Sequence, residues 1–158
     1  MPEKINILYV DDEMPEYQRP VKKVANAFGF NLTLANSLNE AIEHTQNRRF
    51  NLIICDPSLK QVKLPSGKLV YPVDFLAYCE RSYNSHSLIF GGLLIGNTKH
   101  LGGFDFISKL KLVNLVDRFK RLKKSPWKSG ETKINAKALM KPMLHINARG
   151  KKRIIRIF

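Results

Sequence analysis

Residues 5–13 read INILYVDDE, an apolar run that ends in adjacent acidic side chains. An unbroken apolar run of this length predicts a strand that is buried on both faces, as in a parallel sheet. In open α/β sheets, ligands bind outside the carboxyl ends of the strands. Asp11 and Asp12 therefore offer the oxygen ligands that Mg²⁺ prefers. The alternative for the same residues is a solvated turn in which Asp12 or Glu13 caps the next helix.

The remainder of the first 122 residues alternates between strand-like and helix-like segments. Apolar runs predict strands at residues 5–10, 30–34, 50–55, 87–90 and 104–107. Apolar positions at helical spacing predict helices from Pro15 to about residue 28, from Ser37 to about residue 45, at 72–83 and at 112–119. Residues 57–71 are interpreted as a long loop with a small hairpin around Pro65 to Gly67. Five such alternations predict an α/β fold with a doubly wound, five-stranded parallel sheet.

Polar residues follow three of these strands. Asp11 and Asp12 end the first strand, Asp56 ends the third, and Lys109 comes after the fifth. Because the carboxyl ends of parallel strands meet at one edge of a sheet, we expect these side chains to lie together. The order of the segments ILYVDDE, LANSLNEAIEHTQNRRFNLIICD and GGFDFISK resembles the receiver domain of two-component response regulators, which has a flavodoxin-like fold. The resemblance spans residues 5–122.

The resemblance implies a role for each matching residue. Asp56 would be the phosphoacceptor, and Asp11, Asp12 and Asp56 would hold Mg²⁺ together with the backbone carbonyl of Ser58. Lys109 would pair with the acidic cluster and with the incoming phosphate. Phe106 stands at the position of the family's aromatic switch residue. A sensor kinase or another protein would be the partner.

The chain also departs from the receiver pattern. Receivers carry Ser or Thr at the end of the fourth strand, where this chain has Gly91 and Gly92. The segment 93–103 is short for a full fourth helix, and Leu110 follows Lys109 where the family usually has proline. These changes fall on the face that receivers reshape on phosphorylation. A degenerate receiver that serves as a docking module is therefore an open alternative.

The positive charge is concentrated in the last quarter of the chain. Residues 118–158 contain 14 Lys and Arg but only one acidic residue, whereas residues 1–117 contain 13 Lys and Arg and 12 acidic residues. We divide the chain into a receiver-like domain, 1–122, and a basic C-terminal extension, 123–158. The extension is expected to carry a short helix near 136–141 and a strand at 152–158.

Basic residues near a lone tryptophan suit phosphate contacts and base stacking. The predicted nucleic-acid-binding residues are Lys120, Arg121, Lys123, Lys124, Trp127, Lys128, Lys151, Lys152, Arg153 and Arg156. A solvated arm, an acidic protein partner, an anionic membrane surface and addition of the terminal strand to a partner's sheet are alternatives.

Several classes of protein are disfavoured. The sequence has no nucleophile–base set or glycine-rich phosphate loop, so we do not expect a conventional enzyme. No stretch approaches the roughly 18 apolar residues of a membrane span. Cys55 and Cys79 lie in apolar segments, which fits a reduced, cytoplasmic setting. We expect an atypical response regulator receiver, phosphorylated on Asp56 with Mg²⁺; the alternative is a non-phosphorylated adaptor or a nucleic-acid-binding subunit of a larger complex.

Overall fold

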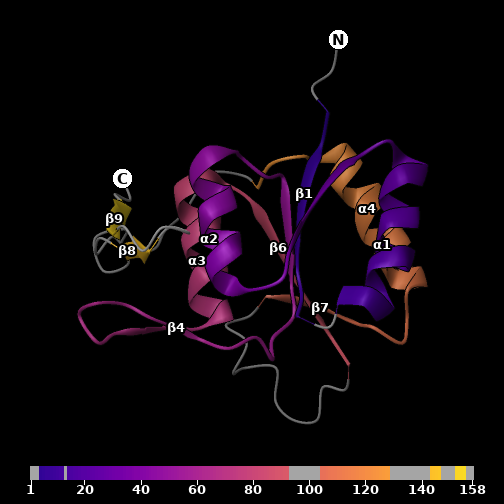
Figure 1. Cartoon of the computed structure of the whole chain (residues 1–158). Coiled ribbons are helices and arrows are strands. Elements are labelled where there is room, and N and C mark those ends of the chain that lie inside the picture. Colours follow the sequence, from indigo (N-terminus) through magenta and orange to yellow (C-terminus); the bar gives the residue numbers. More distant parts are fainter. Residues whose placement is uncertain (1–3, 13, 93–103, 129–142, 147–151, 156–158) are drawn as a thin grey trace.

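The computed structural model describes residues 4–12, 14–92, 104–128, 143–146 and 152–155. Figure 1 shows a sheet with helices on both sides. The elements in chain order are β1 (Asn6–Val10), α1 (Met14–Phe28), β2 (Asn31–Ala35), α2 (Leu38–Asn47), β3 (Leu52–Cys55), β4 (Val62–Lys63), β5 (Leu69–Val70), α3 (Pro72–Tyr83), β6 (His86–Gly91), β7 (Asp105–Ser108), α4 (Val113–Lys124), β8 (Met143–Ile146) and β9 (Lys152–Ile155).

The central sheet has the strand order β2-β1-β3-β6-β7. All four neighbouring pairs are parallel. From β1 the chain adds β2 on one side of the sheet, and it then crosses to the other side of β1 to add β3, β6 and β7 in turn. The structure confirms the doubly wound, five-stranded parallel sheet that the sequence predicts.

Helices cover both faces of this sheet (Figure 1). One face of the core contains Tyr9, Phe90 and Phe119, from β1, β6 and α4. The other contains Leu8 and Phe75, from β1 and α3. Successive strand residues point to opposite faces, so a strand covered on both sides must be apolar throughout. This requirement explains the unbroken apolar runs in β1 and β3.

Local signals in the sequence set the helix ends. The Ser37 hydroxyl accepts a hydrogen bond from the Glu40 backbone N–H at 3.1 Å and caps α2, as the sequence predicts. Gly29 follows α1 with a φ of +72°, a conformation that glycine adopts without steric cost. The predicted hairpin in the loop is formed by β4 and β5, which pair antiparallel around Gly67.

The chain after α4 returns to the body of the protein. Helix α4 continues to Lys124, two residues past the predicted boundary at 122. The Pro126 carbonyl accepts a hydrogen bond from the Asn51 side chain at 3.1 Å, and the Lys128 N–H donates to the Asn84 carbonyl at 2.9 Å. Pro126 and Lys128 therefore contact the receiver-like domain. The division of the chain at residue 122 stays a prediction.

Less of the basic extension is described. Strands β8 and β9 pair antiparallel; β9 covers the described part of the strand expected at 152–158, and β8 was not predicted. The expected helix near 136–141 and the segment 93–103 lie outside the described residues. In the described parts of the chain, no helix is long and apolar enough to cross a membrane.

Candidate functional site

The candidate site lies at the carboxyl edge of the sheet, where Asp11, Asp56 and Lys109 follow β1, β3 and β7. The backbone of each residue extends the sheet's hydrogen bonding by one position. The Asp11 N–H donates to Ala35 O at 3.0 Å, the Asp56 N–H to Val10 O at 3.0 Å, and the Lys109 N–H to Gly91 O at 2.7 Å. The sheet itself therefore places these three residues at one edge, as the sequence predicts.

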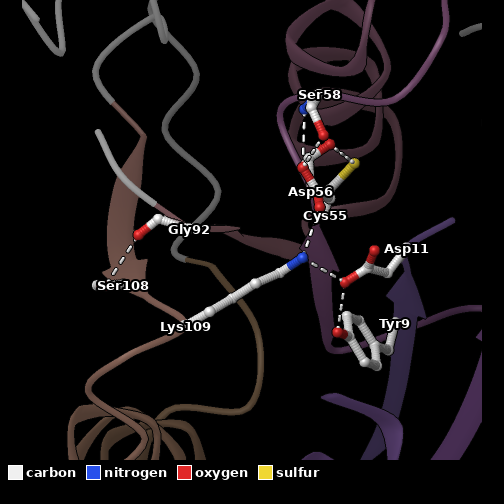
Figure 2. Close-up of polar contacts among 8 residues, drawn as sticks. All are labelled: Tyr9, Asp11, Cys55, Asp56, Ser58, Gly92, Ser108 and Lys109. Atoms are coloured by element: carbon white, nitrogen blue, oxygen red, sulfur yellow. Dashed lines mark hydrogen bonds and ion pairs between the residues drawn. The ribbon is translucent and has the colours of Figure 1, made fainter. Parts of the chain in front are cut away.

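Lys109 joins the two buried carboxylates (Figure 2). Its Nζ lies 2.6 Å from Asp56 Oδ2 and 2.8 Å from Asp11 Oδ2. Asp11 is fully buried, and Asp56 and Lys109 are only 3% and 4% exposed. Buried charges at these distances stabilise each other strongly, because little water screens them. The three side chains form one ionic cluster.

Ser58 holds the second oxygen of Asp56. Its backbone N–H donates to Asp56 Oδ1 at 2.8 Å, and its hydroxyl donates to the same atom at 2.7 Å. Burial by itself raises the pKa of Asp56, but the hydrogen bonds from Lys109 and Ser58 outweigh burial, and the pKa lies below its ordinary value. Asp56 is therefore an ionised carboxylate with both oxygens engaged.

The pKa of Lys109 shifts in the opposite direction. Burial lowers it, but the hydrogen bonds to Asp11 and Asp56 outweigh burial and raise it above its ordinary value. The Lys109 ammonium also lies 4.4 Å from the centre of the Tyr17 ring, which comes from α1. Lys109 is therefore a fixed cation at neutral pH, covered on one side by an aromatic ring.

The site also contains two tyrosines, Tyr9 and Tyr17, that the sequence did not indicate. The Tyr9 hydroxyl donates to Asp11 Oδ2 at 2.6 Å, and burial, then this contact with Asp11, raises the pKa of Tyr9. Tyr9 and Asp11 lie two positions apart, so the strand period could have revealed that they share a face. No sequence signal places Tyr17 above Lys109, because that contact depends on how α1 packs.

The acidic residues can supply a metal site. Carboxylate oxygens of Asp11, Asp12 and Asp56 all lie within 4.8 Å of one another, and Asp12 is exposed to solvent. Three carboxylates at one sheet edge form a set of hard oxygen donors with an open side for water, which fits Mg²⁺. The predicted ligands Asp11, Asp12 and Asp56 come together. The structure describes Ser58 as a hydrogen-bond donor to Asp56, and its role as a carbonyl ligand stays a prediction.

Gly91 ends β6, the fourth strand of the parallel sheet in chain order. A Cβ atom at this position would lie 3.2 Å from Pro57 Cγ and 3.3 Å from Phe106 Cε2. The space beside Gly91 is therefore filled by Pro57 and by the predicted switch residue Phe106. Ser108 carries a hydroxyl nearby, but it donates to the Gly92 carbonyl at 3.1 Å (Figure 2).

The predicted nucleic-acid-binding residues differ in their surroundings. Lys120, Arg121, Lys123 and Lys124 are exposed on α4, and Trp127 is 40% exposed just after it. Lys128 differs from them, because its Nζ forms an ion pair with Glu80 at 2.7 Å. The backbones of Lys152 and Arg153 lie in β9, and Lys151 and Arg156 lie outside the described residues.

Comparison with known proteins leads to one group of solved structures. No family model matches the chain, and a search of curated proteins finds no match. A response regulator receiver domain protein (CheY-like) from Methanospirillum hungatei JF-1 matches with a TM-score of 0.61 and 18% identity, over 78% of this chain and 97% of that one. The signal receiver domain of an HD domain-containing protein from Pseudomonas fluorescens Pf-5 matches with a TM-score of 0.65 and 17% identity, over 78% and 98%.

A two-component response regulator from Clostridium difficile is similar at a TM-score of 0.61 and 19% identity, over 77% of this chain and 98% of that one. Each of these matches covers nearly the whole of the solved domain. The chain therefore has the fold of the response regulator receiver domains.

Proposed function

We propose that this protein is an atypical response regulator receiver that accepts a phosphoryl group on Asp56. The observation that carries the proposal is the buried cluster at the carboxyl edge, in which Lys109 bridges Asp11 and Asp56 at 2.8 and 2.6 Å. A nucleophilic carboxylate, a fixed cation and further acidic oxygens are the groups that phosphoryl transfer to an aspartate requires.

The chemistry at Asp56 follows from these contacts. A carboxylate oxygen of Asp56 forms a bond to the phosphorus of the donor, and the bond to the leaving group breaks with its electron pair. Asp56 Oδ1 must first give up the hydrogen bond from the Ser58 hydroxyl, or Oδ2 its contact with Lys109. The Lys109 ammonium then lies within reach of the oxygens of the transferred group and balances their charge.

A divalent cation completes the proposed site. Asp11, Asp12 and Asp56 would hold Mg²⁺, which supplies positive charge to the phosphoryl oxygens when it is bound. In this proposal the protein has no substrate turnover of its own, acts in the cytoplasm and receives its phosphoryl group from a sensor kinase or a small phosphodonor. It passes the signal to a protein partner.

Labelling with acetyl phosphate tests this function. Intact-protein mass spectrometry is expected to find one added phosphoryl group when Mg²⁺ is present and none when it is chelated. Asp56→Asn is expected to abolish labelling. Asp117→Asn, which removes an exposed carboxylate from α4, is the matched control and is expected to label normally. Unlabelled wild-type protein, or equal labelling of Asp56→Asn, would contradict the proposal.

A second function, a nucleic-acid-binding adaptor that uses the receiver fold as a scaffold, is favoured by the exposed cations on α4. Binding of a DNA duplex or an RNA would weaken steeply with salt, because each phosphate contact releases counterions. It would also survive Asp56→Ala. Replacing Lys120, Lys123 and Lys124 with Gln should reduce the salt dependence. Replacing Lys60, Lys63 and Lys68, which are exposed in and beside the β4–β5 hairpin, removes equal charge and should not.

A further inference from the structure

Tyr9 is a buried polar residue that the proposed phosphoryl transfer does not use. Its side chain is fully buried on β1, and its ring packs edge-on against Phe90 of β6, with 6.0 Å between the ring centres. Its hydroxyl leaves this apolar surrounding and donates to Asp11 Oδ2 at 2.6 Å. A phenylalanine would supply the same apolar ring, so packing alone does not require the hydroxyl.

One oxygen of Asp11 receives two donors (Figure 2). Lys109 Nζ lies 2.8 Å from Asp11 Oδ2, the same atom to which the Tyr9 hydroxyl donates. One donor lies on β1 and the other follows β7. Hydrogen bonds to a carboxylate at these distances are strong and directional. Because a carboxylate is planar, two donors on Oδ2 restrict its rotation and thereby set the direction of Oδ1 as well.

Aromatic packing holds both donors in place. The Tyr9 ring rests against Phe90, and the Lys109 ammonium lies 4.4 Å from the centre of the Tyr17 ring. Tyr17 in turn packs edge-on against Phe90, with 6.3 Å between the ring centres. A donor whose own position is locked by packing fixes the group that it contacts. The orientation of Asp11 is therefore determined by the core between β1, β6 and α1.

Asp11 is also one of the three carboxylates that can hold a divalent cation. Oxygen atoms of Asp11, Asp12 and Asp56 lie within 4.8 Å of one another. Groups that donate hydrogen bonds to a metal ligand orient it, and their removal typically lowers metal affinity about 10–100-fold. The Tyr9 hydroxyl makes such a contact with Asp11.

We propose that Tyr9 is a positioning residue that holds Asp11 in the orientation in which it binds a divalent cation. The inference rests on the proposed function, because it concerns the Mg²⁺ site of phosphoryl transfer. When Lys109 turns toward the transferred phosphoryl group, Asp11 Oδ2 loses one of its two donors. The Tyr9 hydroxyl takes no part in the transfer and stays bonded to Asp11, so the carboxylate keeps its orientation.

Mn²⁺ binding tests this role without a phosphodonor. Mn²⁺ prefers the same oxygen ligands as Mg²⁺, and the electron paramagnetic resonance signal of the free ion gives the Kd of each protein. Tyr9→Phe keeps the ring and removes only the hydroxyl, and it should weaken Mn²⁺ binding about ten-fold. Tyr78→Phe is the matched control. It removes another buried hydroxyl, which bonds with Tyr83 at 3.1 Å on the other face of the sheet, and should leave the Kd unchanged.

Labelling by acetyl phosphate gives a second readout that a general loss of structure would not produce. In Tyr9→Phe, the Mg²⁺ concentration that gives half the maximal labelling rate should rise about ten-fold. The rate at saturating Mg²⁺ should stay within about two-fold of the wild-type rate, because Tyr9 contacts neither Asp56 nor the phosphoryl group.

The two measurements separate this inference from the proposed function. If the wild-type protein binds Mn²⁺ but is not labelled, the proposed function fails, and the Kd values of wild-type protein and Tyr9→Phe still decide the role of Tyr9. The inference is wrong if these two proteins bind Mn²⁺ equally tightly, if the wild-type protein binds none, or if Tyr78→Phe weakens binding as much as Tyr9→Phe.

Discussion

The two ends of the parallel sheet differ in how their buried polar groups are satisfied. At the carboxyl edge, Lys109 pairs with Asp11 at 2.8 Å and with Asp56 at 2.6 Å, and Ser58 donates twice to Asp56. Near the amino end of β6, Ser87 Oγ, Arg81 Nη1 and Arg118 Nε have no hydrogen-bond partner within the described part of the chain. A satisfied cluster stabilises the fold, whereas buried donors without a hydrogen-bond partner reduce its stability. Substitutions at the two ends should therefore act on different properties.

Lys109→Met should give the largest change. It leaves Asp11 and Asp56 buried without their cation, and removal of one partner from a buried ion pair costs about 3 kcal/mol or more. The free energy of unfolding at pH 7, measured by urea denaturation with Mg²⁺ chelated, should fall by that amount. Lys120→Met, which removes an exposed cation from α4, should change it by less than about 0.5 kcal/mol.

The pH dependence of this difference follows from the direction of each pKa shift. The pKa of Asp56 is lowered in the folded protein, so its contribution is present above the ordinary pKa of about 3.9 and is lost as the pH falls through the folded value. The pKa of Lys109 is raised, so its contribution is present below about 10.4 and is lost as the pH rises through the folded value. The free energies of unfolding of the wild-type protein and of Lys109→Met should differ most between these two pH values. A difference that stays constant from pH 3 to pH 11 (roughly the limits above, widened by one unit) would show that the ion pairs do not stabilise the fold.

Gly91→Ala should have an intermediate effect. The new Cβ would lie 3.2–3.3 Å from Pro57 and Phe106, and this crowding should cost about 2 kcal/mol. Combining it with Pro57→Ala should cost less than the sum of the two single changes, because the second change removes the crowding. Gly92→Ala is the control, since no atom of the described residues lies within 4 Å of its added Cβ. Equal destabilisation by both glycine substitutions would mean that the space beside Gly91 is not filled.

Ser85→Ala and Ser87→Ala should have the smallest effects on stability. They should nevertheless differ from each other, although the two serines lie only two positions apart. The Ser85 hydroxyl donates to the Phe50 carbonyl at 2.6 Å, and its loss should cost about 1 kcal/mol. Within the described residues the buried Ser87 hydroxyl has no hydrogen-bond partner, so its removal should leave the free energy of unfolding unchanged or raise it by up to about 1 kcal/mol. Thermal unfolding of the two variants measures this difference. A larger loss for Ser87→Ala would show that its hydroxyl is satisfied within the protein.

Much of the fold and of the acidic cluster could be predicted, because both depend on local pattern. Apolar runs predict the parallel strands, and α3 spans Pro72–Tyr83 as its apolar spacing and Pro72 indicate. Asp56 and Lys109 lie 53 positions apart, yet their meeting could be inferred, because residues that follow parallel strands share one edge.

Contacts between side chains from different elements could not be predicted in this way. The ring of Tyr17 over Lys109 and the packing of Pro57 against Gly91 both depend on distances of a few ångströms between segments. The alternation of apolar and polar residues indicates which face a residue occupies, but it does not determine how two packed faces interlock.

The sequence by itself determined the α/β class, the parallel sheet and the placement of Asp11, Asp56 and Lys109 at one edge of it. These features follow from hydrophobic periodicity and from the position of a residue relative to the end of its strand. Only the tertiary structure decided that Ser58 and Tyr9 also hold the carboxylates, and that buried donor atoms of Arg81, Ser87 and Arg118 have no hydrogen-bond partner among the described residues. Hydrogen bonds form over about 3 Å, so their partners are set by the packing of the folded chain.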